Sequence, residues 1–133
     1  MSWQTQIDVE FQHCDPAGIV FYPRYFEMIN SVIERYFHDH LSYDFATMHF
    51  VDKNGVPTVK IDAEFRAPSR LGDRLTFDLA VERVGNSSLE LLIRASCDAQ
   101  PRMTVRSTLV RIDLGSGNSA PWPKPLADKL RQT

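Results

Sequence analysis

One segment of this chain is apolar around more than half of a helix circumference, and it limits the folds that the chain can adopt. The residues that share the spacing of one helical face are Phe26, Ile29, Ile33, Tyr36 and Phe37. Met28 and Val32 lie off that face and are apolar as well. Because other elements must cover such a helix on several sides, we expect it at the centre of the fold. Pro23 suits the first helical turn, where a missing N–H costs no hydrogen bond, and residues 38–40 are predicted to end the helix.

Five segments alternate apolar and polar residues, which is the pattern of a half-buried β-strand. The first runs from Gln6 to Phe11, before the helix, and the others cover residues 58–65, 75–82, 89–97 and 103–114. The last four are joined by short loops, as antiparallel neighbours are. Residues 41–54, between helix and strands, are predicted to be irregular. In the last segment the apolar parity changes between Leu109 and Val110, which predicts a bulge or a strand that passes between two environments.

This order of elements predicts an α+β fold with a five-stranded antiparallel sheet wrapped around one long central helix. A chain of 133 residues is expected to form a single domain over residues 1–133. Residues 115–133 are proline-rich at first and are predicted to form an extended tail with a short helix from Leu126 to Arg131. A sheet with one covering helix keeps an open face and open edges, so we expect a homo-oligomer.

Charge and composition exclude several kinds of partner. Fifteen basic and seventeen acidic residues leave a net charge of −2, which disfavours a general nucleic-acid binder. No apolar run approaches the roughly 20 residues that span a bilayer, so no membrane partner is expected. The two cysteines are too few for a disulfide scaffold. Without a secretory signal at the N-terminus, the expected location is the cytoplasm.

The residues that best indicate chemistry lie just before the helix. Asp15 is in a turn-rich stretch with Pro16 and Gly18, and the apolar residues 19–21 follow it. The free N–H groups at a helix start can polarise a carbonyl group, and a carboxylate beside them suits acyl transfer or hydrolysis. The alternative is that Asp15 only shapes or caps the turn, as Asp-Pro commonly does. The apolar residues that follow indicate a lined pocket rather than a solvated loop.

Two motifs carry a resemblance to a known family. Residues 14–25, Cys-Asp-Pro-Ala-Gly-Ile-Val-Phe-Tyr-Pro-Arg-Tyr, resemble the signature of the 4-hydroxybenzoyl-CoA thioesterase family of the hotdog fold. Residues 65–75 resemble a second motif, in which Pro68, Gly72 and Asp73 shape a turn between strands. The resemblance spans Thr5 to Leu114. It implies the sheet and helix described above, dimers whose sheets join edge to edge, often paired into tetramers, and active sites at the subunit interface.

The resemblance also implies an activity and its residues. The family hydrolyses acyl thioesters of coenzyme A or acyl carrier protein, without a metal or redox cofactor. Asp15 falls on the family's catalytic carboxylate, which acts as nucleophile or general base. Tyr22 falls where a backbone N–H is supplied to the thioester carbonyl; some relatives have a histidine at this position, and a tyrosine phenol is a poor base at neutral pH.

Substrate contacts are expected from two places. Gly18 and Ile19 belong to the first motif, and the segment through Pro57, Thr58 and Val59 lies where relatives line the pantetheine tunnel. Some relatives hold the CoA nucleotide with arginines in the turn that corresponds to residues 84–88, which has none here. We therefore expect Arg66, Arg70 or arginines of another subunit to hold the nucleotide; the alternative for these arginines is a solvated surface charge.

Five other residues are candidates for catalytic or metal-binding groups. His13 could help Asp15 in proton transfer, or could be only a polar residue at a strand end. Cys14 has no assigned base and is expected to pack as a small residue. Cys97 lies on an apolar strand face and is expected in the core. His38 and His40 cannot share a metal ion on a helix, because side chains two residues apart do not face each other.

Two other functions remain open at this point. A non-catalytic module that binds acyl thioesters would use the same tunnel, but it would gain nothing from a carboxylate near the thioester. A hydratase acting on enoyl thioesters needs a paired acid and base, and no His and Asp in the sequence have the spacing that hydratases of the hotdog fold show. Release of free thiol from a thioester indicates a thioesterase, whereas hydration of an enoyl thioester indicates a hydratase.

Overall fold

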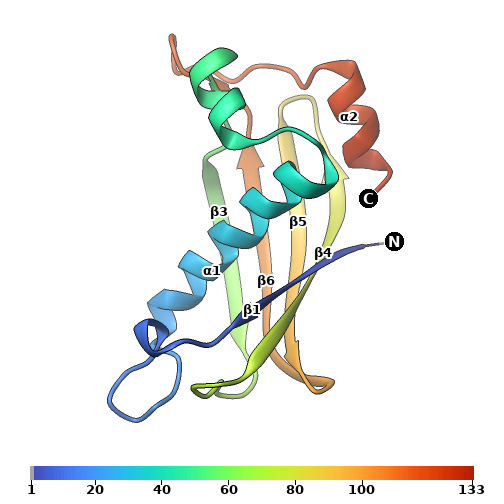
Figure 1. Ribbon diagram of the computed structural model, residues 1–133. Coiled ribbons are helices and arrows are strands. Elements are labelled where there is room, and N and C mark those ends of the chain that lie inside the picture. The colour runs from blue at the N-terminus through green and yellow to red at the C-terminus, as the bar shows by residue number, and fades with distance from the viewer. Residues whose placement is uncertain (1) are drawn as a thin grey trace.

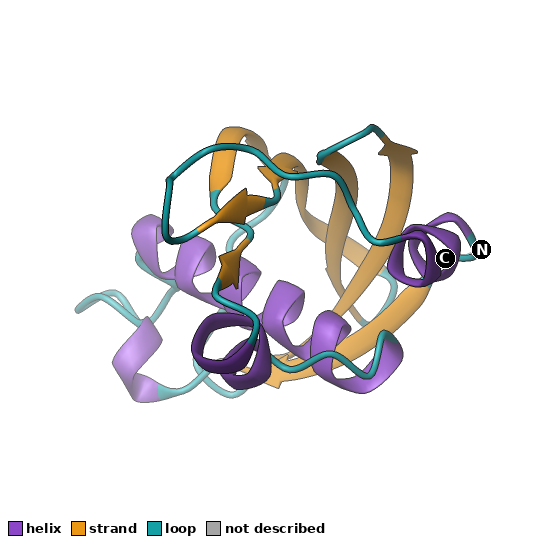
Figure 2. Ribbon diagram, turned by 90° about the horizontal axis from the view of Figure 1, so that it is seen from above, coloured by secondary structure: helices purple, strands orange, loops and turns teal. Residues whose placement is uncertain are grey.

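The computed structural model describes residues 2–133 and shows one long helix held in the curve of an antiparallel sheet (Figure 1). The strands of the sheet are β1 (Trp3–Asp8), β3 (Thr58–Phe65), β4 (Arg74–Val84), β5 (Ser88–Cys97) and β6 (Gln100–Val110). Their order is β1-β4-β5-β6-β3, and every neighbouring pair is antiparallel. Helix α1 (Tyr22–Arg35) lies against one face of the sheet (Figure 2). The predicted α+β hotdog arrangement, five strands wrapped around one helix, is confirmed.

Helix α1 reaches the predicted end because it continues into a π-helical turn (Tyr36–His40). The buried residues of the two segments are Tyr25, Met28, Ile29, Val32, Ile33, Tyr36 and Phe37. Phe26, which the predicted apolar face included, is only half-buried. The covered face is therefore rotated toward Met28 and Val32, and the sheet covers a wider arc of the helix than one stripe.

The sheet presents alternate side chains of its three central strands to the helix. Residues of that face with no more than 1% exposure include Leu75, Phe77, Leu79, Leu89, Leu91, Ile93, Ala95, Met103, Val105 and Leu109. Burial of each large apolar side chain contributes about 1.5–3 kcal/mol relative to exposure. The predicted alternation in these three strands is confirmed, and it produces one continuous core between sheet and helix.

The first strand begins and ends earlier than predicted. β1 pairs with β4 from Trp3 opposite Leu79 to Asp8 opposite Arg74, where β4 starts. Beyond this point the chain forms a 3-10 turn (Phe11–His13), and Phe11 is 83% exposed. The expectation that Phe11 belongs to a buried strand face was wrong, because no partner strand extends that far.

Residues 41–54 are more ordered than predicted. They contain a π-helical turn (Thr47–Val51), and its one buried residue, Met48, enters the core. The segment ends in the two-residue strand β2 (Asn54–Gly55). Strand β2 pairs with β7 (Ile112–Asp113) in a small separate ladder.

The parity change at Leu109 marks the place where the chain leaves the main sheet. β6 ends at Val110, and β7 starts two residues later in the other ladder. A register shift in β3 between Thr58 and Lys60 lies opposite this end of β6. Of the two alternatives for the parity change, the change of environment is confirmed; the extra residue at this place, Val59, belongs to β3 and not to residues 103–114.

The proline-rich tail packs onto the rest of the chain. The Trp122 indole N–H donates to the Ser88 carbonyl oxygen at 3.0 Å. Helix α2 (Lys124–Arg131) follows, beginning two residues before the predicted Leu126, and it buries Leu126, Ala127 and Leu130. This tail closes the end of the molecule that lies beyond the C-terminal end of α1 (Figure 1).

Candidate active site at the start of the central helix

Asp15 lies in a tight hairpin that leads into α1. Cys14 pairs with Val20, and the Asp15 N–H donates to the Ile19 carbonyl oxygen at 3.0 Å. Gly18 has a φ of +75°, a conformation that glycine adopts without steric cost. The Ala17 N–H donates to Asp15 Oδ1 at 2.9 Å. Asp15 thus does shape the turn, but with one carboxylate oxygen; Oδ2 has no hydrogen-bond partner within residues 2–133.

The first turn of α1 has one N–H group without an acceptor. The Phe21 N–H donates to the His13 carbonyl oxygen at 2.9 Å, and the Arg24 N–H donates to the Phe21 carbonyl oxygen at 2.8 Å. Pro23 has no N–H. The Tyr22 N–H has no acceptor in the described part of the chain. A free N–H at a helix N-terminus is a donor for a developing negative charge.

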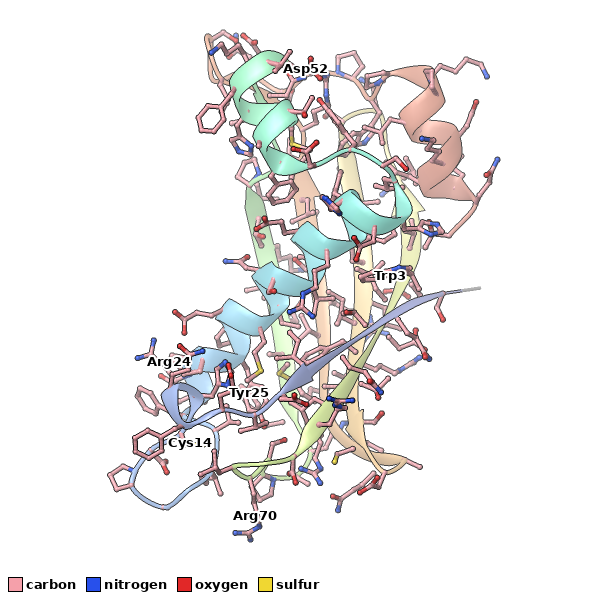
Figure 3. The ribbon with its side chains drawn as sticks, viewed as in Figure 1. Trp3, Cys14, Arg24, Tyr25, Asp52 and Arg70 are labelled. Carbon is pink, nitrogen blue, oxygen red and sulfur yellow. The ribbon has the colours of Figure 1, made fainter. Side chains whose placement is uncertain are left out.

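An open, mostly apolar cavity of about 320 Å³ adjoins the hairpin and the helix start. It is lined by Ile19, Val20, Tyr22, Tyr25, Phe65, Arg66, Ala67 and Pro68. The Phe65 ring centroid lies 5.6 Å from that of Tyr25 and 6.3 Å from that of Tyr22. Asp15 is not part of the lining, but its backbone is bonded to Ile19, which is. Figure 3 shows Cys14, Tyr25 and Arg70 together at this end of the molecule, and Asp52 at the opposite end.

A second loop holds the hairpin from the other side. The Val20 N–H donates to the Ser69 carbonyl oxygen at 2.9 Å, and the Leu71 N–H donates to the Gly18 carbonyl oxygen at 3.0 Å. Within this loop the Arg70 N–H donates to Asp73 Oδ2 at 2.9 Å. This bond, and a second from the Arg102 guanidinium, lower the pKa of the Asp73 carboxyl below its usual value. The turn predicted around Pro68, Gly72 and Asp73 is therefore the support of the Asp15 hairpin.

The structure brings some of the predicted site residues together and keeps others apart. Asp15, Gly18, Ile19 and the Tyr22 N–H lie at the start of α1. The other expected substrate contacts, Pro57–Val59, are exposed and stand at or before the opposite end of β3. Thr58 and Phe65 are seven positions apart along β3, a distance of about 23 Å at a rise of about 3.3 Å per residue. One chain therefore supplies only part of the expected site.

The side chain of His13 is engaged by its own turn. Its Nδ1 accepts a hydrogen bond from the Glu10 N–H at 2.8 Å. The ring lines a different cavity of about 410 Å³ between β1 and α1, together with Glu10, Arg24 and Arg35. Its assistance to Asp15 stays a prediction.

The remaining candidates occupy separate places. Cys97 is buried in the core and Cys14 is half-buried; both are free thiols. Arg66 forms an exposed ion pair with Glu64 at 2.7 Å. His38 bonds to Asp39 at 2.7 Å, which raises the pKa of the imidazole. Over residues 2–133 no three His, Cys, Asp or Glu side chains gather as metal ligands.

Phe65 and Tyr25 were not assigned to the site from the sequence. Phe65 closes an alternating run of apolar residues, and Tyr25 ends the first motif. The alternation could have placed Phe65 on the helix-facing side of the sheet. It gives no sign that the Phe65 ring is 49% exposed at a cavity beside α1.

Within the described residues, no helix is both long and apolar enough to cross a membrane.

The chain is similar to a known family and to proteins of known name. The family model described as "Thioesterase-like superfamily" matches residues 9–130. A curated relative, the 1,4-dihydroxy-2-naphthoyl-CoA hydrolase of Synechococcus elongatus, is 24% identical over 133 residues, which cover 98% of this chain and 96% of the relative.

Two solved structures share the fold. The 1,4-dihydroxy-2-naphthoyl-CoA thioesterase from Synechocystis superposes with a TM-score of 0.89 at 21% identity, covering 98% of this chain and 96% of the other. A protein from Staphylococcus aureus, solved in complex with CoA, superposes with a TM-score of 0.90 at 14% identity, covering 99% and 83%.

Proposed function

The chain belongs to the thioesterase-like superfamily, and on that basis we propose that it hydrolyses an acyl-CoA thioester at the start of α1. The observation that carries this proposal is the unpaired Tyr22 N–H next to the hairpin of Asp15. One group supplies a donor for an oxyanion, and the other supplies a carboxylate with a free oxygen. Thioester hydrolysis requires both functions in one place.

The reaction follows from these two groups. Asp15 takes a proton from water, and the resulting hydroxide attacks the thioester carbonyl carbon. The Tyr22 N–H stabilises the negative oxygen of the tetrahedral intermediate. The intermediate then expels the CoA thiolate, which takes up a proton, and leaves the free acid. In the second route a carboxylate oxygen of Asp15 attacks the carbonyl carbon, and the CoA thiolate leaves and takes up a proton. Water then hydrolyses the mixed anhydride to the free acid and the Asp15 carboxylate. Neither route needs a metal or a redox cofactor.

For the acyl group we propose an aromatic acid. Three aromatic rings, those of Tyr22, Tyr25 and Phe65, border the cavity beside the Tyr22 N–H. Such rings pack against another ring in stacked or edge-to-face geometry. The names of the Synechococcus elongatus and Synechocystis relatives state a naphthoyl thioester of CoA as the substrate. These names, and the CoA bound to the Staphylococcus aureus protein, favour CoA over acyl carrier protein as the thiol.

We further propose that the working enzyme is a homodimer joined through β3, or a pair of such dimers. β3 is a free edge of the sheet, and Val59, Ile61 and Phe65 on it are 61%, 39% and 49% exposed. Antiparallel pairing of two copies about a point between Ile61 and Asp62 places Thr58 of one copy opposite Phe65 of the other. The expected contacts at residues 57–59 then reach the partner's Asp15 end. A sedimenting mass of one chain contradicts this assembly.

The free thiols Cys14 and Cys97 fit a reducing compartment such as the cytoplasm, and we propose that location for the enzyme. Immunoblotting of fractionated cells tests it. Recovery of the chain in the membrane or secreted fraction contradicts it.

The test of the activity is thiol release from 1,4-dihydroxy-2-naphthoyl-CoA, benzoyl-CoA and hexanoyl-CoA, with wild type and Asp15→Asn compared. Asparagine keeps the Oδ1 that accepts from the Ala17 N–H, so the turn is retained. Loss of the charge is expected to lower kcat by about 100-fold or more. CoA binding without hydrolysis would instead make the protein a binding module, and hydration of crotonyl-CoA would make it a hydratase.

A further inference from the structure

Arg102 is the extra residue of a bulge in the central sheet. In the ladder between β5 and β6, Ala95 lies opposite Met103, but the next residue, Ser96, lies opposite Pro101. Arg102 is therefore skipped by the pairing. A bulge turns one side chain away from the regular alternation of its strand.

The side chain of Arg102 is buried and concentrates its hydrogen bonds on one loop. It is only 9% exposed, and its Nη1 donates to three acceptors of residues 68–73. These are the Pro68 carbonyl oxygen at 3.1 Å, Ser69 Oγ at 3.2 Å and Asp73 Oδ2 at 2.7 Å. The cost is visible at Nε, which is buried without a partner. Burying an unpaired donor costs about 1–3 kcal/mol, so stability alone is a weak reason for this placement.

The backbone of Arg102 holds the same loop. The Arg66 N–H donates to the Arg102 carbonyl oxygen at 2.8 Å, and the Ala67 N–H approaches the same oxygen at 3.4 Å. Residues 66–73 are thus attached to the bulge at both ends. The loop in turn holds the Asp15 hairpin through the Val20 N–H to Ser69 bond and the Leu71 N–H to Gly18 bond.

We propose that Arg102 is a positioning residue for Asp15, acting through the loop of residues 66–73. Arg102 is not among the residues that line the cavity beside the Tyr22 N–H, and it is not proposed to contact a reacting atom. Its guanidinium fixes the loop, and the loop holds residues 18–20 of the hairpin. The Asp15 N–H to Ile19 bond joins Asp15 to those residues, and so sets its position relative to the Tyr22 N–H. The inference rests on the proposed function for the catalytic role of Asp15, but the mechanical link stands on the contacts alone.

The test compares Arg102→Met and Arg102→Lys with Arg106→Met as a matched control. Arg106 is on the same strand and exposed, and within residues 2–133 its side chain bonds only to Glu82, at 3.2 Å. Two measurements are made on each protein: kcat and KM for the best thioester, and hydrogen exchange of the Val20 and Leu71 amides. A displacement of the hairpin by about 1 Å is expected to lower kcat by about 100-fold with little change in KM.

Hydrogen exchange distinguishes local loosening of the hairpin from a general loss of stability, which would raise the exchange rates of all amides. In Arg102→Met the Val20 and Leu71 amides are expected to exchange faster, while the amides of β1 and β4 keep wild-type protection. Arg102→Lys retains the charge, but its ammonium lies on a shorter side chain and lacks the planar guanidinium, so intermediate values are expected. If Arg102→Met does not fold, Arg102→Lys and Asp73→Asn carry the same comparison, because Asp73→Asn removes the charged partner of the same guanidinium.

The outcomes separate the two proposals. A folded Arg102→Met that keeps wild-type kcat and wild-type exchange at Val20 and Leu71 overturns the positioning role. Equal losses in Arg106→Met overturn it too, because the effect would then belong to the strand. If instead Asp15→Asn is as active as wild type, the proposed catalytic role fails, and faster exchange at Val20 and Leu71 still establishes the link between Arg102 and the hairpin.

Discussion

The two ends of the central helix carry similar aromatic residues in opposite environments. At the C-terminal end Tyr36 and Phe37 are fully buried, whereas at the start of α1 Tyr22 is 60% exposed. The Trp3 ring packs 5.7 Å from that of Tyr36, and the Tyr36 hydroxyl meets Thr133 Oγ1 at 2.6 Å. Helical spacing therefore predicts where an aromatic ring lies on the helix. Elements far away in the sequence decide whether that ring is buried in the core or exposed at the candidate site.

The same comparison assigns a different measurable property to each end. Tyr36 is covered by Trp3 of β1 and by Thr133, and the Phe37 ring packs against those of Tyr36 and Phe45. Substitution of either buried ring should therefore change the free energy of unfolding. At the start of α1 the Tyr22 side chain stays exposed beside the cavity, so its substitution should change activity. The following predictions, in order of decreasing size, test this division.

The largest expected effect is on stability at the C-terminal end of the helix, which holds Tyr36 and Phe37 and is called the closed end here; the start of α1 at Tyr22 is the open end. Phe37→Ala removes a fully buried ring, and the free energy of unfolding should fall by about 3–5 kcal/mol. The matched change at the open end, Tyr22→Ala, should cost about 0.5 kcal/mol or less, because the ring is exposed. Urea unfolding of both variants measures the difference. Similar losses would mean that the two ends do not differ in the way described.

The next effect is on catalysis at the open end. Tyr22→Pro removes the unpaired N–H at the first helical position, where proline is well tolerated. Phe21 already has φ −69° and ψ 122°, a conformation that suits the residue before proline. We expect kcat to fall by about 10²–10³-fold, as for loss of one oxyanion donor. Tyr22→Ala is the control that loses the ring and keeps the N–H; an equal fall in kcat there would assign the effect to the ring.

The smallest effect is the pH dependence of the closed end. Burial raises the pKa of Tyr36 to about 12, against the opposing effect of the Thr133 hydrogen bond. The folded protein therefore holds the phenol proton more tightly than the unfolded chain does. This stabilisation is complete below pH 10 and is lost as the pH rises toward 12.

The matched variant for that pH dependence is Tyr36→Phe. At neutral pH it should lose about 1 kcal/mol with the hydrogen bond to Thr133. Above pH 10 its stability should decline less steeply than that of wild type, in unfolding curves recorded across that range. An identical decline in both proteins would show that other groups cause it.

Local patterns were sufficient to predict the helix and the three central strands. Alternation in β4 and β5 is a property of neighbouring residues, and the sheet covers the residues that it marks. The same rule failed at Phe11, because the end of β1 is set by Arg74, where β4 begins. A pairing limit so far along the chain leaves no local sign.

The site was predictable only where a motif is continuous in the sequence. Asp15 and Tyr22 lie seven residues apart, and one hairpin and one helix turn place them together. Arg102 gave no signal, because a bulge depends on how two strands are paired and not on either strand alone. Thr58 and Val59 lie far from Asp15 in one chain, and a single sequence does not show how copies associate.

The pairing of β1 with β4 also has a consequence for the order of assembly. β4, β5 and β6 are joined by short hairpins, whereas Trp3 must find Leu79 across most of the chain. Closing long loops slows folding, so we expect the three-stranded meander to form first and β1 to join it late. The Asp15 hairpin lies a few residues after β1 and is hydrogen-bonded to the loop that precedes β4. In refolding, activity should therefore return after the sheet signal in circular dichroism, with simultaneous recovery as the contrary result.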